Sequence, residues 1–242
     1  MNERISLTVR SLTKSFGGVK VVDDLSFDVP SGSVFSLLGV NGAGKTTAIR
    51  MLTGLLTPDS GTAFLASHPM GSDAAARIIG LSPQETSTAP NLTVAENLIM
   101  TASVYGMDSP ESRAAEIMER LSLTDHRDTR SKHLSGGLRR RLSIAMGIIH
   151  EPEILFLDEP TLGLDVLARR ELWSLVNELR QSMTILLTTH YMEEAEALSD
   201  TIAVMDHGHL LACGTMEELR QLTGLVSLED IFVSLAQKGG VR

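Results

Sequence analysis

The sequence contains a single cysteine, Cys213, among its 242 residues. One cysteine excludes an intrachain disulfide framework and a zinc site built from several thiolates, and this scarcity favours a reducing cytosol. Basic residues are in the minority, because 21 Lys and Arg stand against 30 Asp and Glu and give a net charge of -9. Such a chain is not expected to bind nucleic acid or anionic lipid through a broad electrostatic surface. Any phosphate group must therefore be bound locally.

Long hydrophobic runs are also lacking. The apolar stretches 34–40 and 144–149 are far shorter than the roughly 18 residues of a membrane-spanning helix. The N-terminus shows no apolar core of the signal-peptide kind. We therefore expect a chain that does not itself cross a bilayer. Its length corresponds to one large domain, or to a core that carries one inserted subdomain.

The pattern of apolar residues predicts an α/β fold. Alternation at 5–9 and 25–29 indicates half-buried strands. Continuous apolar runs at 34–38, 154–157 and 184–187 indicate strands that are covered on both faces, and the helical periodicity between the last two favours a parallel sheet. The stretch 84–149 lacks strand signals, and Thr93 to Glu96 has the spacing of a capping box, so we predict helices there. A terminal hairpin is expected over 201–213, and a last helix near Ser227.

A glycine-rich sequence follows the first buried strand and opens a helix. It reads Gly39-Val-Asn-Gly-Ala-Gly-Lys-Thr46 and matches the phosphate-binding pattern G-x-x-x-x-G-K-[ST]. The glycines allow successive backbone N–H groups to point at an anion, beside the positive end of the helix. We expect Lys45 to reach the β- and γ-phosphates of a nucleotide and Thr46 to offer its hydroxyl to Mg²⁺. The candidate nucleotide-binding residues are Gly39, Asn41, Gly42, Ala43, Gly44, Lys45, Thr46 and Thr47.

Two carboxylates, Asp158 and Glu159, follow directly after the buried run 154–157. Ligands bind at the carboxyl ends of the strands in such sheets. We expect Asp158 to orient Mg²⁺ through its water shell and Glu159 to act as general base toward an attacking water. Without the phosphate loop, the same pair would indicate only a helix N-cap or a solvated loop.

The element Leu134-Ser-Gly-Gly137, ahead of Asp158, resembles the signature motif of the ATP-binding cassette ATPases, and the likeness extends from about Leu7 to Gly214. The resemblance implies a P-loop NTPase (RecA-like) core, residues 1–84 and 151–225, with an N-terminal antiparallel β subdomain. It also implies an inserted helical subdomain, 85–150, and a short C-terminal helix and tail, 226–242. In the family two chains form a head-to-tail dimer, in which Ser135, Gly136 and Gly137 of one chain face the γ-phosphate held by the other.

The resemblance implies roles for four further residues. Phe16 stands at the place of an aromatic that stacks on adenine, and Gln84 at that of a glutamine that contacts Mg²⁺ and the attacking water. Asp165 stands in the loop that communicates across the dimer, and His190 is similar to the histidine that contacts the γ-phosphate. As bare sequence features, Phe16, Gln84 and His190 would be a core or edge aromatic, a turn residue and a structural histidine.

Three positions depart from the family pattern. Leu138 stands where many members have a glutamine, and because leucine cannot hydrogen-bond the ribose, we expect altered affinity across the interface. Val40 replaces a frequent proline and Phe16 a frequent tyrosine, and neither change removes a required donor. The basic run Arg139–Arg141 is open to two interpretations: a solvated helix face, or a cluster that steers phosphate or holds the dimer.

The partners also follow from the resemblance. The segments 91–98, 188–196 and 227–232 are similar to ATP-binding subunits of bacterial drug, antibiotic and sodium exporters. We expect ATP and Mg²⁺, an integral membrane permease subunit and a second ATP-binding subunit, no nucleic acid, and a peripheral place on the cytoplasmic face of the cell membrane. In such subunits residues 85–98 receive the permease, so Leu92 and Leu98 serve either docking or the core. The alternatives are an importer ATPase and a cassette ATPase acting on ribosomes or DNA; a P-loop kinase or nucleotide switch leaves Ser135–Gly137 unexplained.

Overall fold

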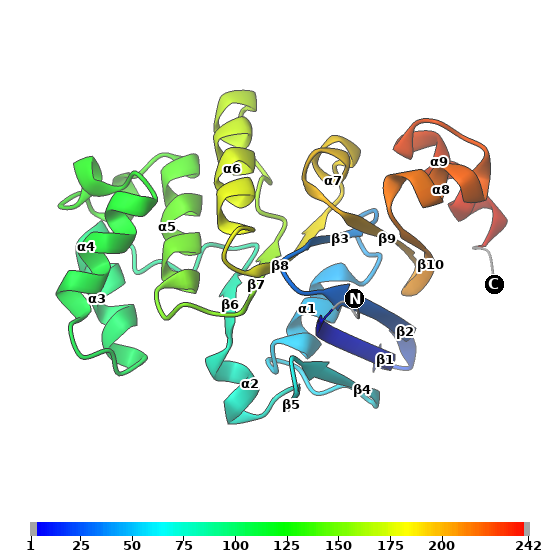
Figure 1. The fold of residues 1–242 in the computed structure, drawn as a ribbon, viewed down its shortest axis with the longest axis horizontal. Helices are drawn as coiled ribbons and strands as arrows, with labels where there is room; N and C mark the ends of the chain where they lie inside the picture. Colours follow the sequence, from blue (N-terminus) through cyan, green and yellow to red (C-terminus); the bar gives the residue numbers. More distant parts are fainter. Residues whose placement is uncertain (1–3, 240–242) are drawn as a thin grey trace.

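A computed structural model describes residues 4–239 and places a six-stranded sheet at the centre of the molecule (Figure 1). The strand order is β10-β9-β3-β8-β7-β6. All neighbours are parallel except β10, which pairs antiparallel with β9 in the expected terminal hairpin. The strands are β3 (Val34–Leu38), β6 (Ile79–Ser82), β7 (Ile154–Asp158), β8 (Thr184–Thr189), β9 (Thr201–Asp206) and β10 (His209–Gly214).

The continuous apolar runs of the sequence form the middle of this sheet. Every residue of β3, β7 and β8 is buried, because both faces of the sheet are covered by other elements. Successive side chains of β7 point to opposite faces: Ile154 and Phe156 belong to one apolar cluster, Leu155 and Leu157 to the other. The predicted α/β fold with a parallel sheet is confirmed.

A second sheet, entirely antiparallel, is formed by the N-terminal part of the chain (Figure 1). Its order is β2-β1-β4-β5, formed by β1 (Ile5–Phe16), β2 (Val19–Pro30), β4 (Ser60–Leu65) and β5 (His68–Pro69). Together with α1 (Lys45–Leu52) it covers one face of the central sheet, so Leu7, Leu25, Ile49 and Phe156 share one apolar cluster. Strands β4, β5 and β6 were not predicted from the sequence.

The other face of the central sheet is covered by helices, in the region where the sequence predicts them (Figure 1). Thr93 and Glu96 form the expected capping box of α3, and Pro110 begins α4. The helices between β6 and β10 are α3 (Val94–Val104), α4 (Pro110–Arg120), α5 (Gly136–Ile148), α6 (Val166–Leu179) and α7 (Met192–Leu198), with short 3-10 turns at Thr124–His126 and Ser131–His133. The remaining helices are α2 (Asp73–Arg77), α8 (Met216–Thr223) and α9 (Leu228–Lys238), the last capped by Ser227.

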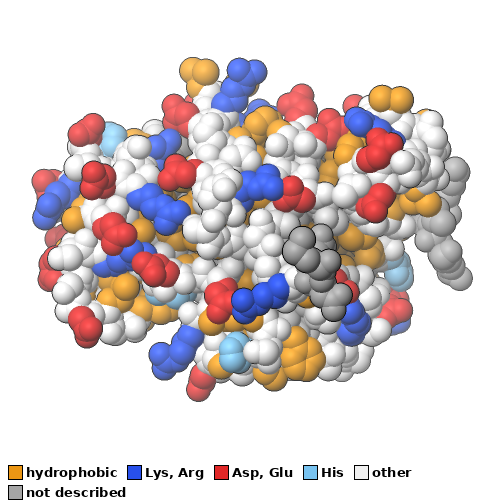
Figure 2. Space-filling view, in the orientation of Figure 1, with side chains coloured by type: hydrophobic (Ala, Val, Ile, Leu, Met, Phe, Trp, Pro, Cys, Tyr) orange, Lys and Arg blue, Asp and Glu red, His pale blue; other side chains and the backbone are white. Residues whose placement is uncertain are grey.

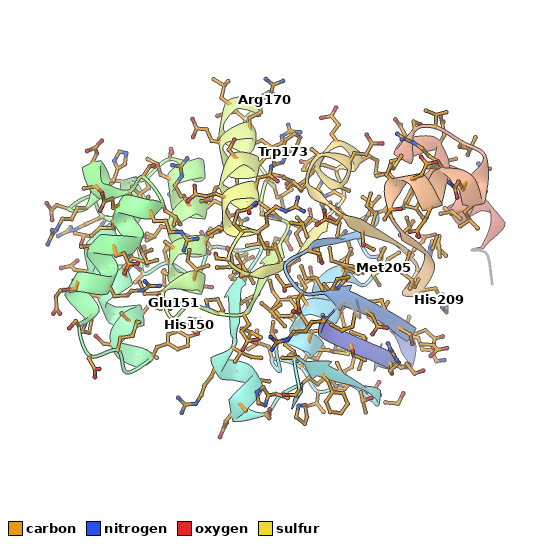
Figure 3. The ribbon with its side chains drawn as sticks, in the orientation of Figure 1. His150, Glu151, Arg170, Trp173, Met205 and His209 are labelled. Atoms are coloured by element: carbon orange, nitrogen blue, oxygen red, sulfur yellow. The ribbon has the colours of Figure 1, made fainter. Side chains whose placement is uncertain are left out.

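One apolar cluster runs without interruption from α3 and α4 to the central sheet. It contains Leu98 of α3, Ile117 of α4, Leu142 of α5, Leu157 of β7 and Val176 of α6. Leu98 is fully buried and therefore belongs to the core, whereas Leu92 is partly exposed. Trp173 lies on α6, and its indole N–H donates to Glu194 of α7 at 3.1 Å (Figure 3). The segment with α3 to α5 thus shares its interior with the sheet.

The surface carries both signs of charge. On the face shown in Figure 2, Lys and Arg side chains alternate with Asp and Glu side chains over α4 to α7. Of the helices within residues 4–239, none combines the length and the apolar composition that crossing a lipid bilayer would require.

Candidate functional site

The phosphate loop of the sequence connects β3 to α1 and lies at the carboxyl end of the central sheet. Gly42 and Gly44 take left-handed backbone conformations, with φ of 86° and 99°. At Gly44 a Cβ atom would also come within 2.4 Å of the carbonyl oxygen of Val21, so only glycine fits there. Gly44 leads directly into the first turn of α1, where the unpaired N–H groups of a helix form an anion site.

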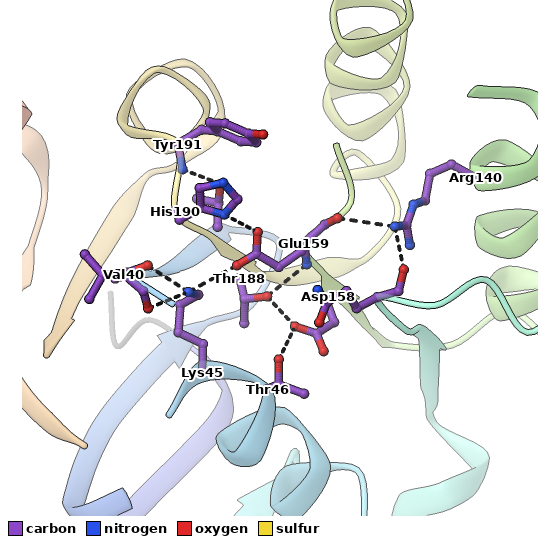
Figure 4. Close-up of polar contacts among 12 residues, drawn as sticks. Val40, Lys45, Thr46, Arg140, Asp158, Glu159, Thr188, His190 and Tyr191 are labelled. Atoms are coloured by element: carbon purple, nitrogen blue, oxygen red, sulfur yellow. Dashed lines mark hydrogen bonds and ion pairs between the residues drawn. The ribbon is translucent and has the colours of Figure 1, made fainter. Parts of the chain in front are cut away.

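Lys45 extends from the start of α1 back into this loop (Figure 4). Its ammonium group donates to the carbonyl oxygens of Gly39 at 2.7 Å and Val40 at 3.2 Å. It also lies 3.1 Å from Oε1 of Glu159, and both side chains are almost fully buried. A buried charge of this kind is stabilised only while its partners remain in place. Lys45 and Glu159 therefore form one electrostatic unit.

Asp158 is bound by two hydroxyl groups from neighbouring elements (Figure 4). Thr46 of α1 donates to Oδ1 at 3.1 Å, and Thr188 of β8 donates to the same oxygen at 2.6 Å. Within residues 4–239 there is no group of three or more His, Cys, Asp or Glu side chains that could hold a metal ion alone. The hydroxyl of Thr46 and the carboxylate of Asp158 are hard oxygen ligands, which fits Mg²⁺ that completes its shell with water and phosphate oxygens.

Glu159 adopts a left-handed backbone conformation with φ of 48°, which is uncommon for a residue with a side chain. Its N–H group donates to Thr188, to the hydroxyl at 2.9 Å and to the carbonyl at 3.2 Å. Its carboxylate reaches His190, which follows β8, with Oε2 lying 2.5 Å from Nδ1. His190 in turn lies against the ring of Tyr191, with centroids 4.0 Å apart. The carboxylate thus lies between Lys45 and His190, at the ends of three strands.

A cavity of about 280 Å³ opens beside these groups. It is lined by Asn41 to Thr47 of the phosphate loop, by Glu159 and by Gln84, which follows β6. A larger groove of about 800 Å³ continues from Gln84 between α1, α3 and α5. The structure therefore brings the phosphate loop, Gln84 and Glu159 around one space, as the sequence reading expects.

Other expected site residues are not among those that line this cavity. Phe16, at the end of β1, is half exposed and its ring lies 5.7 Å from the ammonium of Lys14. Ser135 is exposed and caps α5 by accepting from the N–H of Leu138 at 3.2 Å. Gly136 and Gly137 complete that helix start, and they lie beside Leu164 and Ala168 at the start of α6.

Asp165 and Leu138 have local structural contacts. Asp165 is exposed and caps α6 by accepting from the N–H of Ala168 at 2.9 Å. The side chain of Leu138 packs against the apolar cluster of the helices. At this position the leucine therefore contributes to the interior of α5 and its neighbours.

The three arginines after the signature element differ from one another. Arg140 is buried, and its guanidinium donates to backbone carbonyl oxygens, so the expectation of a solvated helix face is wrong for this residue. Burial lowers the pKa of Arg140, and the nearby carboxylates of Asp158, Glu194 and Glu159 oppose that shift. Arg139 and Arg141 are partly exposed; Arg139 donates to the carbonyl of Ser131, among others, and Arg141 pairs with Glu171 at 3.0 Å.

Thr188 was not predicted from the sequence as a member of this site, and Arg140 was considered only as part of the basic run Arg139–Arg141. Thr188 was visible only as the first of two polar residues that end a buried strand. Arg140 carried no local signal, since a cation on a helix with exposed neighbours predicts a solvated side chain. The place of both residues in the site depends on contacts between elements that are far apart in the sequence.

Known proteins resemble this chain over most of its length. A family model described as "ABC transporter" matches residues 22–162. The chain is 44% identical over 224 residues to the daunorubicin/doxorubicin resistance ATP-binding protein DrrA of Streptomyces peucetius, which covers 90% of this chain and 68% of that protein. It is 42% identical over 215 residues to the Nod factor export ATP-binding protein I of Burkholderia orbicola, with 87% and 71% covered.

A solved structure gives the same result. The chain superimposes on a protein described as the ATP binding subunit of an ABC transporter with a TM-score of 0.85 and 30% sequence identity. The superposition covers 95% of this chain and 99% of that one.

Proposed function

The chain belongs to the ABC transporter family, whose ATP-binding subunits are ATPases coupled to transport, and we propose on that premise that it powers the export of a solute through a separate membrane-spanning subunit. One observation carries the proposal. A continuous network of contacts at the carboxyl ends of β3, β7 and β8, beside the phosphate loop, joins Lys45, Thr46, Asp158, Glu159 and His190, with Thr188 as the link between the two carboxylate residues.

The phosphate loop binds the triphosphate of ATP in this proposal. Backbone N–H groups from Gly42 to Thr46 surround the phosphates, and the ammonium of Lys45 neutralises the β- and γ-oxygens. Thr46 and Asp158 hold Mg²⁺, which when bound neutralises charge on the phosphate oxygens. Phe16 stacks on the adenine ring, a contact worth about 1–3 kcal/mol by analogy with base stacking.

Hydrolysis uses the carboxylate of Glu159. Glu159 accepts the proton of the attacking water, and His190 and Lys45 stabilise the charge that develops on the transferring phosphoryl group. Gln84 orients the water from the side of β6. Because such catalysis consists mainly of positioning and electrostatics, the fixed backbone of Glu159 matters as much as its carboxylate.

Two copies complete each site in this proposal. Ser135, Gly136 and Gly137 begin α5 with free N–H groups, which suits an anion. They lie outside the residues that line the cavity of their own chain, so we assign them to the γ-phosphate bound by a second copy, with Asp165 near that interface. The two copies then close head to tail on two ATP molecules.

Mixing two inactive variants tests this arrangement. Lys45→Ala removes the phosphate grip, and Ser135→Asp keeps the cap of α5 while placing a negative charge opposite the γ-phosphate. We expect each variant alone to lack ATPase activity. A mixture should regain about one quarter of wild-type turnover, because half of its dimers contain one intact composite site of two. Turnover that stays at the level of the separate variants would contradict the head-to-tail dimer.

Co-purification and transport in vesicles together distinguish export from the alternatives. The mixed charges of the surface in Figure 2 favour a protein partner over nucleic acid, and the sequence relatives include drug-resistance and Nod factor export proteins. We expect the tagged chain to capture an integral membrane protein from detergent-solubilised membranes, and so to lie at the cytoplasmic face of the membrane. The pair, reconstituted in vesicles with ATP on the chain's own side, should move solute away from that side. Capture of ribosomes or DNA, or movement toward the ATP-containing side, would contradict export.

A further inference from the structure

Arg140 occupies a position where three parts of the chain meet. It lies on α5, the helix that Ser135 caps, and its side chain points away from solvent toward the ends of β6 and β7 (Figure 4). Only 4% of the residue is exposed. Burying a guanidinium costs free energy unless its donors find partners. The burial of Arg140 therefore depends on the hydrogen bonds that its guanidinium makes.

Those contacts are all with backbone carbonyl oxygens. Its guanidinium donates to the carbonyl of Pro83 at 2.6 Å, of Gln84 at 2.8 Å and of Glu159 at 3.3 Å. The first two belong to the segment after β6, and the third to the segment after β7. A lysine could not reproduce this set, because the planar guanidinium presents its donors in a fixed fork.

The register of the sheet explains why this bridge is needed. Ser82 and Leu157 form the last paired position of β6 and β7. Gln84 and Glu159 both lie beyond that pair, where strand hydrogen bonds no longer hold the two segments together. On the other side, Glu159 is fixed to β8 through its N–H and Thr188. Arg140 supplies the corresponding tie on the β6 side, through the carbonyl of Glu159.

The hydrogen bond from Arg140 also supports the uncommon backbone conformation of Glu159. The φ of 48° at Glu159 is unfavourable for a residue with a side chain and persists only when neighbours hold it. Its N–H donates to Thr188, and its carbonyl accepts from the N–H of Leu162 at 3.1 Å and from Arg140 at 3.3 Å, so Arg140 links this turn to α5. Arg140 thus acts on the backbone and does not occupy the place of the reacting atoms.

We propose that Arg140 is a positioning residue, which aligns Gln84 with Glu159 beyond the end of the sheet and ties both to the helix that Ser135 caps. The proposal rests on the assignment of Glu159 as base and of Ser135 to the second copy. Because a helix moves as a rigid element, a shift of α5 when Ser135 meets a nucleotide reaches Gln84 and Glu159 of its own chain through Arg140.

The test compares neighbouring arginines on α5 in the purified chain. Arg140→Gln removes the charge and most of the hydrogen-bond donors, and Arg140→Lys keeps the charge without the planar guanidinium. Arg141→Gln is the matched control. Among the hydrogen bonds and ion pairs of residues 4–239, Arg141 contacts only Leu121 and Glu171. We expect Arg140→Gln to lower kcat for ATP about 10- to 10²-fold, because small misplacements cost that much. Its KM should change little, Arg140→Lys should lie between, and the control should retain wild-type kcat.

A double-mutant cycle distinguishes positioning from mere folding support. If Arg140 acts through Glu159 and Gln84, adding Arg140→Gln to Glu159→Gln should lower the residual single-turnover rate by clearly less than it lowers the wild-type rate, whereas independent effects would multiply. Thermal unfolding shows whether each variant is folded at the assay temperature. Equal kcat for Arg140→Lys, Arg140→Gln and Arg141→Gln, or multiplicative loss in the cycle, would overturn the proposal. A wild-type chain without turnover, or unchanged turnover in Glu159→Gln, would instead overturn the proposed function on which it rests.

Discussion

Glu159→Gln is expected to lower the turnover of ATP by about 10²- to 10⁴-fold, the usual contribution of a positioned general base. The amide keeps the size of the side chain but cannot accept the proton of the attacking water. The amide oxygen can still face Lys45, so ATP should bind with nearly wild-type affinity. With hydrolysis blocked, ATP should hold the two copies together, and a stable dimer should appear in size-exclusion chromatography when ATP is present.

A control for this variant lies on the same strand segment. Glu153 immediately precedes β7 at its opposite end and is exposed. Glu153→Gln also replaces a carboxylate by an amide, and so changes the net charge by the same amount, but it leaves the network around Lys45 intact. We expect its turnover to match the wild type. Unchanged turnover in Glu159→Gln, or a similar loss in both variants, would remove Glu159 from the role of base.

Lys45→Ala is expected to lower kcat/KM for ATP by about 10³-fold or more. A hydrogen bond to a charged group contributes about 1.5–3 kcal/mol to binding, and loss of one preorganised charge at the reacting centre costs a further 10²- to 10³-fold in rate. In addition, the buried carboxylate of Glu159 loses its ion pair with Lys45 while its contact with His190 remains, so its negative charge beside the phosphates is less well compensated. Equilibrium binding of a fluorescent ATP analogue and steady-state kinetics measure the two effects separately.

The double variant Lys45→Ala, Glu159→Gln distinguishes two effects: the loss of the contact between the lysine and the phosphates, and the repulsion between the phosphates and the carboxylate of Glu159. If repulsion by the carboxylate of Glu159 is the larger effect, the double variant should bind ATP more tightly than Lys45→Ala does. Lys20→Ala serves as the control, because Lys20 pairs with Asp23 on the surface of β2. Full ATP affinity in Lys45→Ala would contradict the assigned phosphate grip.

The parts of the fold that the sequence predicted are those with local signals. Continuous apolar runs placed β3, β7 and β8, and capping residues such as Thr93 and Ser227 placed the starts of α3 and α9. The motif of the phosphate loop placed its residues at the carboxyl end of the sheet for the same reason, since strand, loop and helix are consecutive in the chain. The predicted meeting of the loop with Asp158 followed from the parallel arrangement of the strands.

The parts that escaped prediction depend on contacts between distant segments. Thr188 and Asp158 meet because β7 and β8 are neighbours in register. Arg140 is buried because α5 covers the ends of β6 and β7, and a run of three arginines does not reveal which one faces inward. The assignment of Ser135 and Asp165 to an interface between copies remains a proposal, because both lie on the surface of a single chain.

The apolar cluster that extends from α3 to β7 gives the helices α3 to α6 and one face of the central sheet a common interior. Leu98, Ile117 and Leu157 share that interior, so separating the helices from the sheet would expose apolar side chains of both to water. The stretch 85–150 consequently has no complete interior of its own and depends on the strands for its stability. Heat should therefore melt these helices and the central sheet in one transition.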